Sequence, residues 1–183
     1  MFKPVKSILF ATNLSENCRP ALEASLFMAG HYGADIVLLH VVDRDVPLQV
    51  EEHFKAVLGE EKWEELKQEH EQDAREALIG KMSSKKIVEK VMAKYKRDLG
   101  IEGTEADFNW RDVVLSDKNI DRAIVRQAME EGCELIVMGT GKDFLGDNSL
   151  GATISGVLRK SKIPVMVVPA HTEGNTPPEA LGR

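Results

Sequence analysis

Residues 35–42 read Asp35-Ile36-Val37-Leu38-Leu39-His40-Val41-Val42, a nearly continuous apolar run that indicates the fold class. Its apolar side chains follow one another without the alternation that marks a strand with one solvated face. A strand buried on both faces is typical of a parallel sheet with helices packed on each side. An α/β protein is therefore expected. His40 interrupts the run, and a satisfied core histidine is the expected role, with a catalytic histidine as the alternative.

Strands and helices alternate along the chain around this stretch. Short apolar runs predict the strands, and apolar residues at helical spacing predict the helices. Expected strands are residues 7–12, 35–42, 108–115, 134–138 and 163–168, and expected helices are residues 19–32, 120–131 and 152–159. Alternation of this kind indicates a parallel sheet. The sequence therefore predicts one doubly wound α/β domain over residues 1–170, with a five-stranded parallel sheet and helices on both faces.

A helical insert is expected between the second and third strands, over residues 44–100. Its charges are segregated. Residues 51–76 hold ten acidic and four basic side chains, a net of −6, whereas residues 81–97 hold one acidic and seven basic, a net of +6. Two readings stay open: two solvated helix faces of different sign, or helices or subunits attracted by opposite charge. Residues 171–183 lack apolar periodicity and are expected to be a flexible tail.

The composition bounds the class of protein. The formal charge of −6 over 183 residues argues against nucleic acid as a partner, because phosphate binding needs a basic face. No apolar run approaches the ~20 residues of a membrane span. The apolar run at residues 8–11 is too short for a signal-peptide core, so a cytoplasmic protein is expected. Cys18 and Cys133 lack disulfide-framework or metal-ligand spacing and are expected to be reduced.

Candidate ligand-binding residues follow the predicted strands. Ligands of open parallel sheets bind outside the carboxyl ends of the strands, where the strand order reverses. Those ends lead into Thr12-Asn13, Val41-Val42-Asp43 and Met138-Gly139-Thr140-Gly141. The loop 139–151 then enters a predicted helix near Ala152, whose free N–H groups suit a phosphate. A simple glycine turn is the alternative.

Two standard phosphate-binding motifs do not fit. A P-loop requires glycine where Ile136 stands and Ser or Thr where Asp143 stands. A dinucleotide fingerprint requires glycines after the first strand, where residues 11–14 have none. Solvated loop or turn residues are the expected role of the nearby polar side chains, with ligand contact as the alternative. They are Asp43, Asp45, Asp143, Asp147 and Asn148.

Five segments, taken in order, resemble the universal stress protein family. They are residues 7–15, 34–42, 134–140, 150–152 and 163–168. The resemblance covers roughly residues 3–168 apart from the insert. It implies an adenine-nucleotide α-hydrolase-like sheet with strand order 3-2-1-4-5. It also implies a homodimer in which strand 163–168 pairs with its copy across a twofold axis, and twofold dimers are the commonest homo-oligomers.

The family's nucleotide-binding branch carries a glycine, two residues, a glycine, nine residues, then glycine and Ser or Thr. Nine residues separate Gly141 from Gly151, as in the family, but Thr140 alone separates Gly139 from Gly141.

Two further positions depart from the branch. Ala152 takes the Ser/Thr place, with Thr153 next, and Asn13 takes the place of an Asp that meets the adenosine part. The resemblance implies these nucleotide-binding residues: Thr12, Asn13, Val41, Met138, Gly139, Gly141, Gly151, Ala152 and Thr153.

The implied function is a stress-response regulatory module that binds ATP or a related adenine nucleotide such as AMP. Mg²⁺ is expected only alongside ATP, and no cofactor is required. The alternative is a dimeric stress adaptor whose degenerate cleft binds no nucleotide. A slow ATPase is the least favoured reading, because no general base or metal-binding acid is identifiable in the loop. Residues 51–98 are a candidate surface for a protein partner.

Overall fold

A computed structural model describes three continuous parts of the chain and six isolated residues. The continuous parts are residues 4–43, 109–141 and 150–170, and the isolated residues are Glu60, Glu61, Glu64, Ala93, Lys96 and Arg97. The predicted tail 171–183 and most of the predicted insert lie outside the described residues. The opposed charges of residues 51–76 and 81–97 are therefore not tested.

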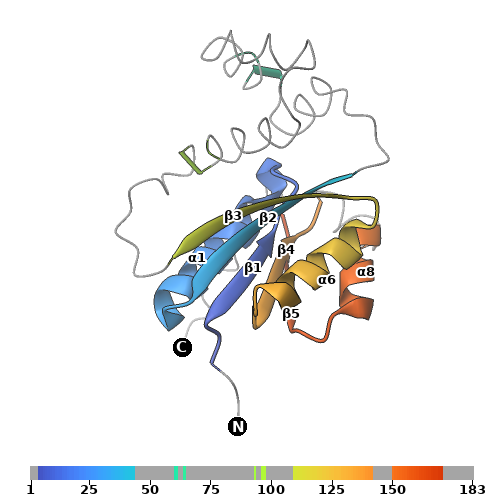
Figure 1. Ribbon diagram of the computed structural model, residues 1–183. Coiled ribbons are helices and arrows are strands. Elements are labelled where there is room, and N and C mark those ends of the chain that lie inside the picture. Colours follow the sequence, from blue (N-terminus) through green and yellow to red (C-terminus); the bar gives the residue numbers. More distant parts are fainter. Residues whose placement is uncertain are drawn as a thin grey trace, which may run out of the picture.

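Five parallel strands form one sheet in the order β3-β2-β1-β4-β5, which confirms the predicted fold and strand order (Figure 1). The strands are β1 Ser7–Ala11, β2 Asp35–Asp43, β3 Trp110–Asp117, β4 Leu135–Gly139 and β5 Val165–Val168. The register pairs Ile8 of β1 with Ile36 on one side and Leu135 on the other. The chain leaves β1 toward β2 and β3, and later returns beside β1 as β4. The strand order therefore reverses between β1 and β4.

The last strand is shorter than its apolar run predicts. β5 begins at Val165, although Ile163 opens the run. The Ile163 N–H donates to Ser161 Oγ at 3.0 Å, which holds this residue in a turn. Pro164 then contributes only its carbonyl, which accepts from the Ile136 N–H at 3.0 Å.

Helices cover both faces of the sheet, as predicted (Figure 1). Helix α1, Arg19–Tyr32, follows the short 3-10 helix η1, Glu16–Cys18. Helices α6, Ile120–Glu130, and α8, Ala152–Lys160, lie together on the other face. One apolar core forms between α1 and the sheet, and a second forms between the sheet and the α6–α8 pair. Burial on both sides explains the unbroken apolar run of β2.

The central strands hold the most buried side chains. Ile8 and Phe10 of β1 and Leu38 of β2 are fully buried. His40 is buried in the same layer, and its Nδ1 lies 2.9 Å from the carbonyl oxygen of Thr12. That hydrogen bond joins the carboxyl ends of β1 and β2.

Lys96 of the insert contacts the sheet. Lys96 Nζ lies 2.5 Å from Asp112 Oδ2 of β3 and 5.5 Å from the centre of the Trp110 ring. Trp110 Nε1 donates to the other carboxylate oxygen of Asp112 at 2.6 Å. A lysine of the basic half of the insert therefore contacts β3, which is the edge of the sheet opposite β5.

Both cysteines are buried and form no disulfide. Burial raises the pKa of the Cys133 thiol, and the hydrogen bond with Ser7 opposes that rise only in part. Within the described parts of the chain, no helix is both long and apolar enough to cross a bilayer.

Candidate functional site

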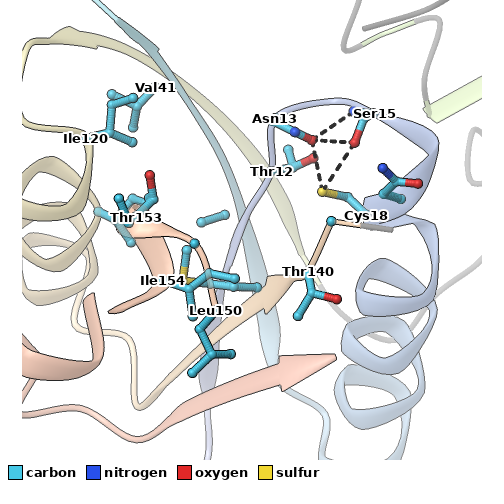
Figure 2. Close-up of a pocket in the computed structure, with 18 of the residues that line it drawn as sticks. Thr12, Asn13, Ser15, Cys18, Val41, Ile120, Thr140, Leu150, Thr153 and Ile154 are labelled. Atoms are coloured by element: carbon cyan, nitrogen blue, oxygen red, sulfur yellow. Dashed lines mark hydrogen bonds between the residues drawn. The ribbon is translucent and has the colours of Figure 1, made fainter. Parts of the chain in front are cut away.

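A pocket of about 540 Å³ opens at the carboxyl ends of the central strands, beside the point where the strand order reverses (Figure 2). Its size falls in the range of small-molecule sites, roughly 300–1,000 Å³. Every residue predicted to bind nucleotide lines this one pocket: Thr12, Asn13, Val41, Met138, Gly139, Gly141, Gly151, Ala152 and Thr153. The residues come from β1, β2, β4 and the start of α8, so the fold gathers four separate segments.

The turn after β1 is fixed by its own side chains. Thr12 Oγ1 accepts the Leu14 N–H at 2.9 Å, and Asn13 Oδ1 accepts the Ser15 N–H at 3.0 Å. Leu14 has a φ of 66°, which is unusual for a branched residue, and its side chain is buried in the core under α1. Core packing of Leu14 thus holds the turn in a strained conformation that leaves Asn13 exposed at the pocket.

The side chain of Asn13 has a defined orientation. Its Oδ1 also accepts from Ser15 Oγ at 2.7 Å and from Cys18 Sγ at 3.1 Å, as Figure 2 shows. A backbone N–H can only donate, so the atom facing the Ser15 N–H must be the oxygen. The amide nitrogen is then the remaining polar atom of Asn13 at the pocket. An aspartate here would present a second acceptor in its place.

Gly139, at the end of β4, has a packing role. A Cβ atom here would lie 3.1 Å from Cys18 Cα and 3.3 Å from the Asn17 carbonyl oxygen. Both neighbours are backbone atoms of η1, so β4 and η1 approach as closely as they do because residue 139 has no side chain. Gly141 differs, because no described atom lies within 4 Å of a Cβ built there.

The start of α8 forms another wall. Gly151 is its N-cap residue, with φ 70° and ψ 151°, a conformation suited to glycine, and it supplies no capping side chain. The carbonyl of Gly151 accepts the Ser155 N–H at 3.1 Å, and no described side chain caps the N–H groups of the first turn. Thr153 places a hydroxyl in the same turn (Figure 2). Polar donors therefore converge on this end of the pocket.

The remaining lining is apolar. It comes from the strand ends, α6 and the approach to α8: Ala11, Leu39, Val41, Ile120, Ile124, Met138, Leu150 and Ile154. No Asp, Glu, Lys, Arg or His lines the pocket among the residues that the structure describes. No metal-binding group of His, Cys, Asp and Glu is found in that same set. The described walls thus offer an apolar surface, hydroxyl and amide groups, and backbone N–H groups.

Several lining residues were not singled out from sequence. Ser15, Asn17 and Cys18 follow β1 directly, and their cap-type composition was a usable signal. Ile120 and Ile124 come from α6, and nothing in their spacing indicates that this helix reaches the cleft.

The weaker sequence candidates do not join the site. Asp43 ends β2 and does not line the pocket. Asp45, Asp143, Asp147 and Asn148 lie outside the described residues.

Fold and pocket together define a doubly wound α/β protein with a pocket, of the size that small molecules occupy, at its topological switch point. The family model for the universal stress protein family matches residues 4–169. The chain belongs to the universal stress protein family, as its sequence resemblance predicts.

Individual relatives agree with this assignment. Universal stress protein MJ0577 of Methanocaldococcus jannaschii is 27% identical over 164 residues, which cover 89% of this chain and 94% of the relative. A solved structure of MJ0577 superposes with a TM-score of 0.56 at 26% identity, covering 93% of this chain and 99% of the other.

Two more distant solved structures share the fold and contain nucleotides. An Archaeoglobus fulgidus universal stress protein in complex with dAMP has a TM-score of 0.53 at 15% identity, covering 90% of this chain and 98% of its own. A universal stress protein in complex with cAMP has a TM-score of 0.52 at 15% identity, covering 92% of this chain and 100% of its own.

Proposed function

We propose that this chain is a regulatory module that binds an adenine nucleotide in the pocket at the carboxyl ends of β1, β2 and β4. One observation carries the proposal: a single cavity of about 540 Å³ combines an apolar wall with the start of α8, which no described side chain caps. An adenine ring is flat and largely apolar, and a phosphate is anionic. The two chemistries of the pocket match the two ends of such a ligand.

The phosphate belongs at the start of α8. Backbone N–H groups and the helix dipole favour an anion there, and Gly151 lets the phosphate approach the backbone without a side chain in the way. Ala152 brings no hydroxyl, and Thr153 supplies one from the next position. Loss of one such hydrogen bond weakens binding by about 1 kcal/mol, or several-fold in affinity.

The base and ribose belong against the apolar wall between β1, β2 and α6. Val41 and Ile120 lie beside one another on this side of the pocket, across from Asn13 (Figure 2). The amide nitrogen of Asn13 offers a hydrogen-bond donor to this part of the ligand. The dAMP and cAMP complexes of the two distant relatives support AMP-type nucleotides as the ligand class.

ATP is a second candidate ligand, with Mg²⁺ accompanying it. The molecule is a homodimer through the segment 163–168, which contains β5, and acts in a stress response in the cytoplasm. Residues 51–98 are the proposed surface for a protein partner.

A dimeric adaptor without nucleotide is the second candidate function. Two site residues already have structural roles that would hold them in place without a ligand. Gly139 allows β4 to meet η1, and the Asn13 oxygen fixes the turn after β1. If Gly139 and Asn13 serve only these structural roles, the pocket binds no nucleotide.

Backbone amide NMR separates the two candidates. We expect AMP at millimolar concentration to shift the amide resonances of Asn13, Gly141 and Gly151, which line the pocket, in a saturable way. Ala34 is the matched reference, because its N–H bonds to Ala29 at the amino-terminal end of β2, away from the pocket. Shifts confined to other surfaces, or no shifts, would favour the adaptor.

A further inference from the structure

Thr140 joins the rim of the pocket to the end of the edge strand. Its N–H donates to the Val168 carbonyl at 3.0 Å, and its Oγ1 accepts the Ala170 N–H at 3.1 Å. Both Thr140 and Ala170 are buried, at 3% and 6% exposure. Thr140 also lines the pocket, between Gly139 and Gly141. One residue therefore lines the cavity, holds the last residue of β5 by one hydrogen bond and holds Ala170, just beyond β5, by another.

The Thr140 hydroxyl accepts a hydrogen bond that no backbone group accepts among the described residues. Pro169 follows the last residue of β5, and by alternation its backbone faces away from β4, so the next donor on the β4 side is the Ala170 N–H. The next donor, the Ala170 N–H, is buried, and buried N–H groups need an acceptor. Among the described residues, Thr140 Oγ1 is the acceptor that the structure provides. Any displacement of Thr140 must therefore be followed by Ala170 or break this hydrogen bond.

The Gly139 end of the Gly139–Gly141 segment is also constrained. Gly139 packs directly against the backbone of η1, which leaves it little room to move toward that helix. A ligand that orders the segment from within the cavity would therefore act on β5 through Thr140.

We propose that Thr140 is a positioning residue that couples occupancy of the pocket to the carboxyl end of β5. This inference rests on the proposed nucleotide site and adds a regulatory path to it. Linkage makes the coupling reciprocal. If a partner that binds along β5, such as a second copy of the chain, changes the affinity for nucleotide by some factor, nucleotide changes the affinity for that partner by the same factor.

Hydrogen exchange measured residue by residue with AMP as the probe tests the coupling. In the wild-type protein, saturating AMP should slow exchange of the Ala170 amide at least about threefold more than that of the Ala34 amide. Thr140→Ser retains an oxygen acceptor and should keep this difference. Thr140→Val has nearly the same shape but no acceptor, and should abolish the difference when AMP is again saturating.

Thr153→Val is the matched control. It also removes a pocket hydroxyl, but Thr153 lies on α8. It should preserve the selective slowing at Ala170 once AMP is saturating, whatever its effect on affinity.

Three outcomes overturn the inference. An undiminished response in Thr140→Val does so, as does wild-type protein that binds AMP without a selective response at Ala170. Both leave the proposed function intact. Failure of the wild-type protein to bind AMP at all, measured by calorimetry on the same sample, overturns the proposed function and the coupling together.

Discussion

Gly139 and Gly141, both of the pocket, differ in what surrounds them, and substitution separates the two. A Cβ added to Gly139 would lie 3.1 and 3.3 Å from backbone atoms of η1, whereas a Cβ added to Gly141 would meet no described atom within 4 Å. Gly139→Ala should therefore destabilise the fold by about 1–3 kcal/mol through overpacking. Gly141→Ala should change stability by no more than about 0.5 kcal/mol. Urea unfolding of both variants checks the pair, and equal losses of stability would contradict the packing role of Gly139.

Gly151 is constrained by its backbone rather than by its neighbours. A Cβ there would meet nothing within 4 Å, but φ is 70°. Gly151→Ala should therefore cost about 1–3 kcal/mol of stability from backbone strain and also weaken AMP binding by moving the start of α8. A valine at this position would be strained as well, so a loss of binding in Gly151→Val would not by itself report blocked phosphate space.

Gly33 is the matched control for that substitution. It also has a positive φ, 62°, with nothing within 4 Å of an added Cβ, and it ends α1 away from the pocket. Gly33→Ala should lower the free energy of unfolding by a similar amount and leave AMP affinity unchanged. Parallel denaturation and AMP titration measure both quantities. Equal affinities of Gly151→Ala and Gly33→Ala would exclude Gly151 from the binding site.

At the scale of the elements, α6 and α8 approach closely at one point and are tied by an ion pair there. A Cβ on Gly156 of α8 would overlap the carboxyl group of Asp121, so this helix contact requires glycine. Asp121 also pairs with Lys160 at the end of α8. That hydrogen bond with Lys160 is the main reason why the pKa of Asp121 is lowered from its ordinary 3.8.

The sign of the resulting pH dependence follows from linkage. A carboxyl with a lowered pKa in the folded state contributes stability above its unfolded pKa, and loses it as pH falls through the folded pKa. Wild-type stability should therefore decline below about pH 4, and Asp121→Asn should show a shallower decline over that range. Chemical denaturation at a series of pH values from neutral to acid measures both curves. Parallel curves would show that the pair contributes nothing.

Most elements could be predicted because their signals are local. The apolar run of β2 and the helical spacing of α1 depend on neighbouring residues in the chain, and both elements appear where they were expected. The Lys96–Asp112 contact joins the insert to β3 and has no such local signal. The two charged halves of the insert remain a prediction about residues 51–97.

The candidate site also has some features that the sequence predicts and others that it does not. The strand-end rule and the family resemblance predicted nine residues that the structure gathers in one pocket. Contacts across the fold could not be predicted, because they depend on how elements pack: Cys18 against Asn13, Gly139 against η1, and α6 against the cleft. Each involves an approach that spacing along the chain does not encode.

At the scale of the whole molecule, β5 is an edge strand with partly exposed side chains from Val165 to Val168. Pro164 and Val168 direct their carbonyls to β4, so by alternation the backbone of Val167 faces the open edge. The Val167 side chain packs toward the core between the sheet and the α6–α8 pair. A lysine at residue 167 would therefore disturb the core as well as the edge.

Proline is the cleaner test of the proposed dimer. Val167→Pro removes an edge N–H without removing a donor to β4, and should weaken dimerisation at least tenfold. Val167→Ala loses the same packing but keeps the N–H, so its dimer should stay close to wild type. Sedimentation velocity across micromolar concentrations reports both. A monomeric wild-type protein, or equal association of the two variants, would argue against pairing through β5.

Equilibrium dialysis with AMP tests the central claim most directly, because it measures binding without assuming where or how the ligand acts. The wild-type chain should retain AMP at one site per chain, saturating at or below roughly 1 mM, which corresponds to about −4.1 kcal/mol or tighter. ATP, with and without Mg²⁺, should compete for that site. No retention of AMP or ATP at millimolar concentration by folded protein would contradict the nucleotide-binding account.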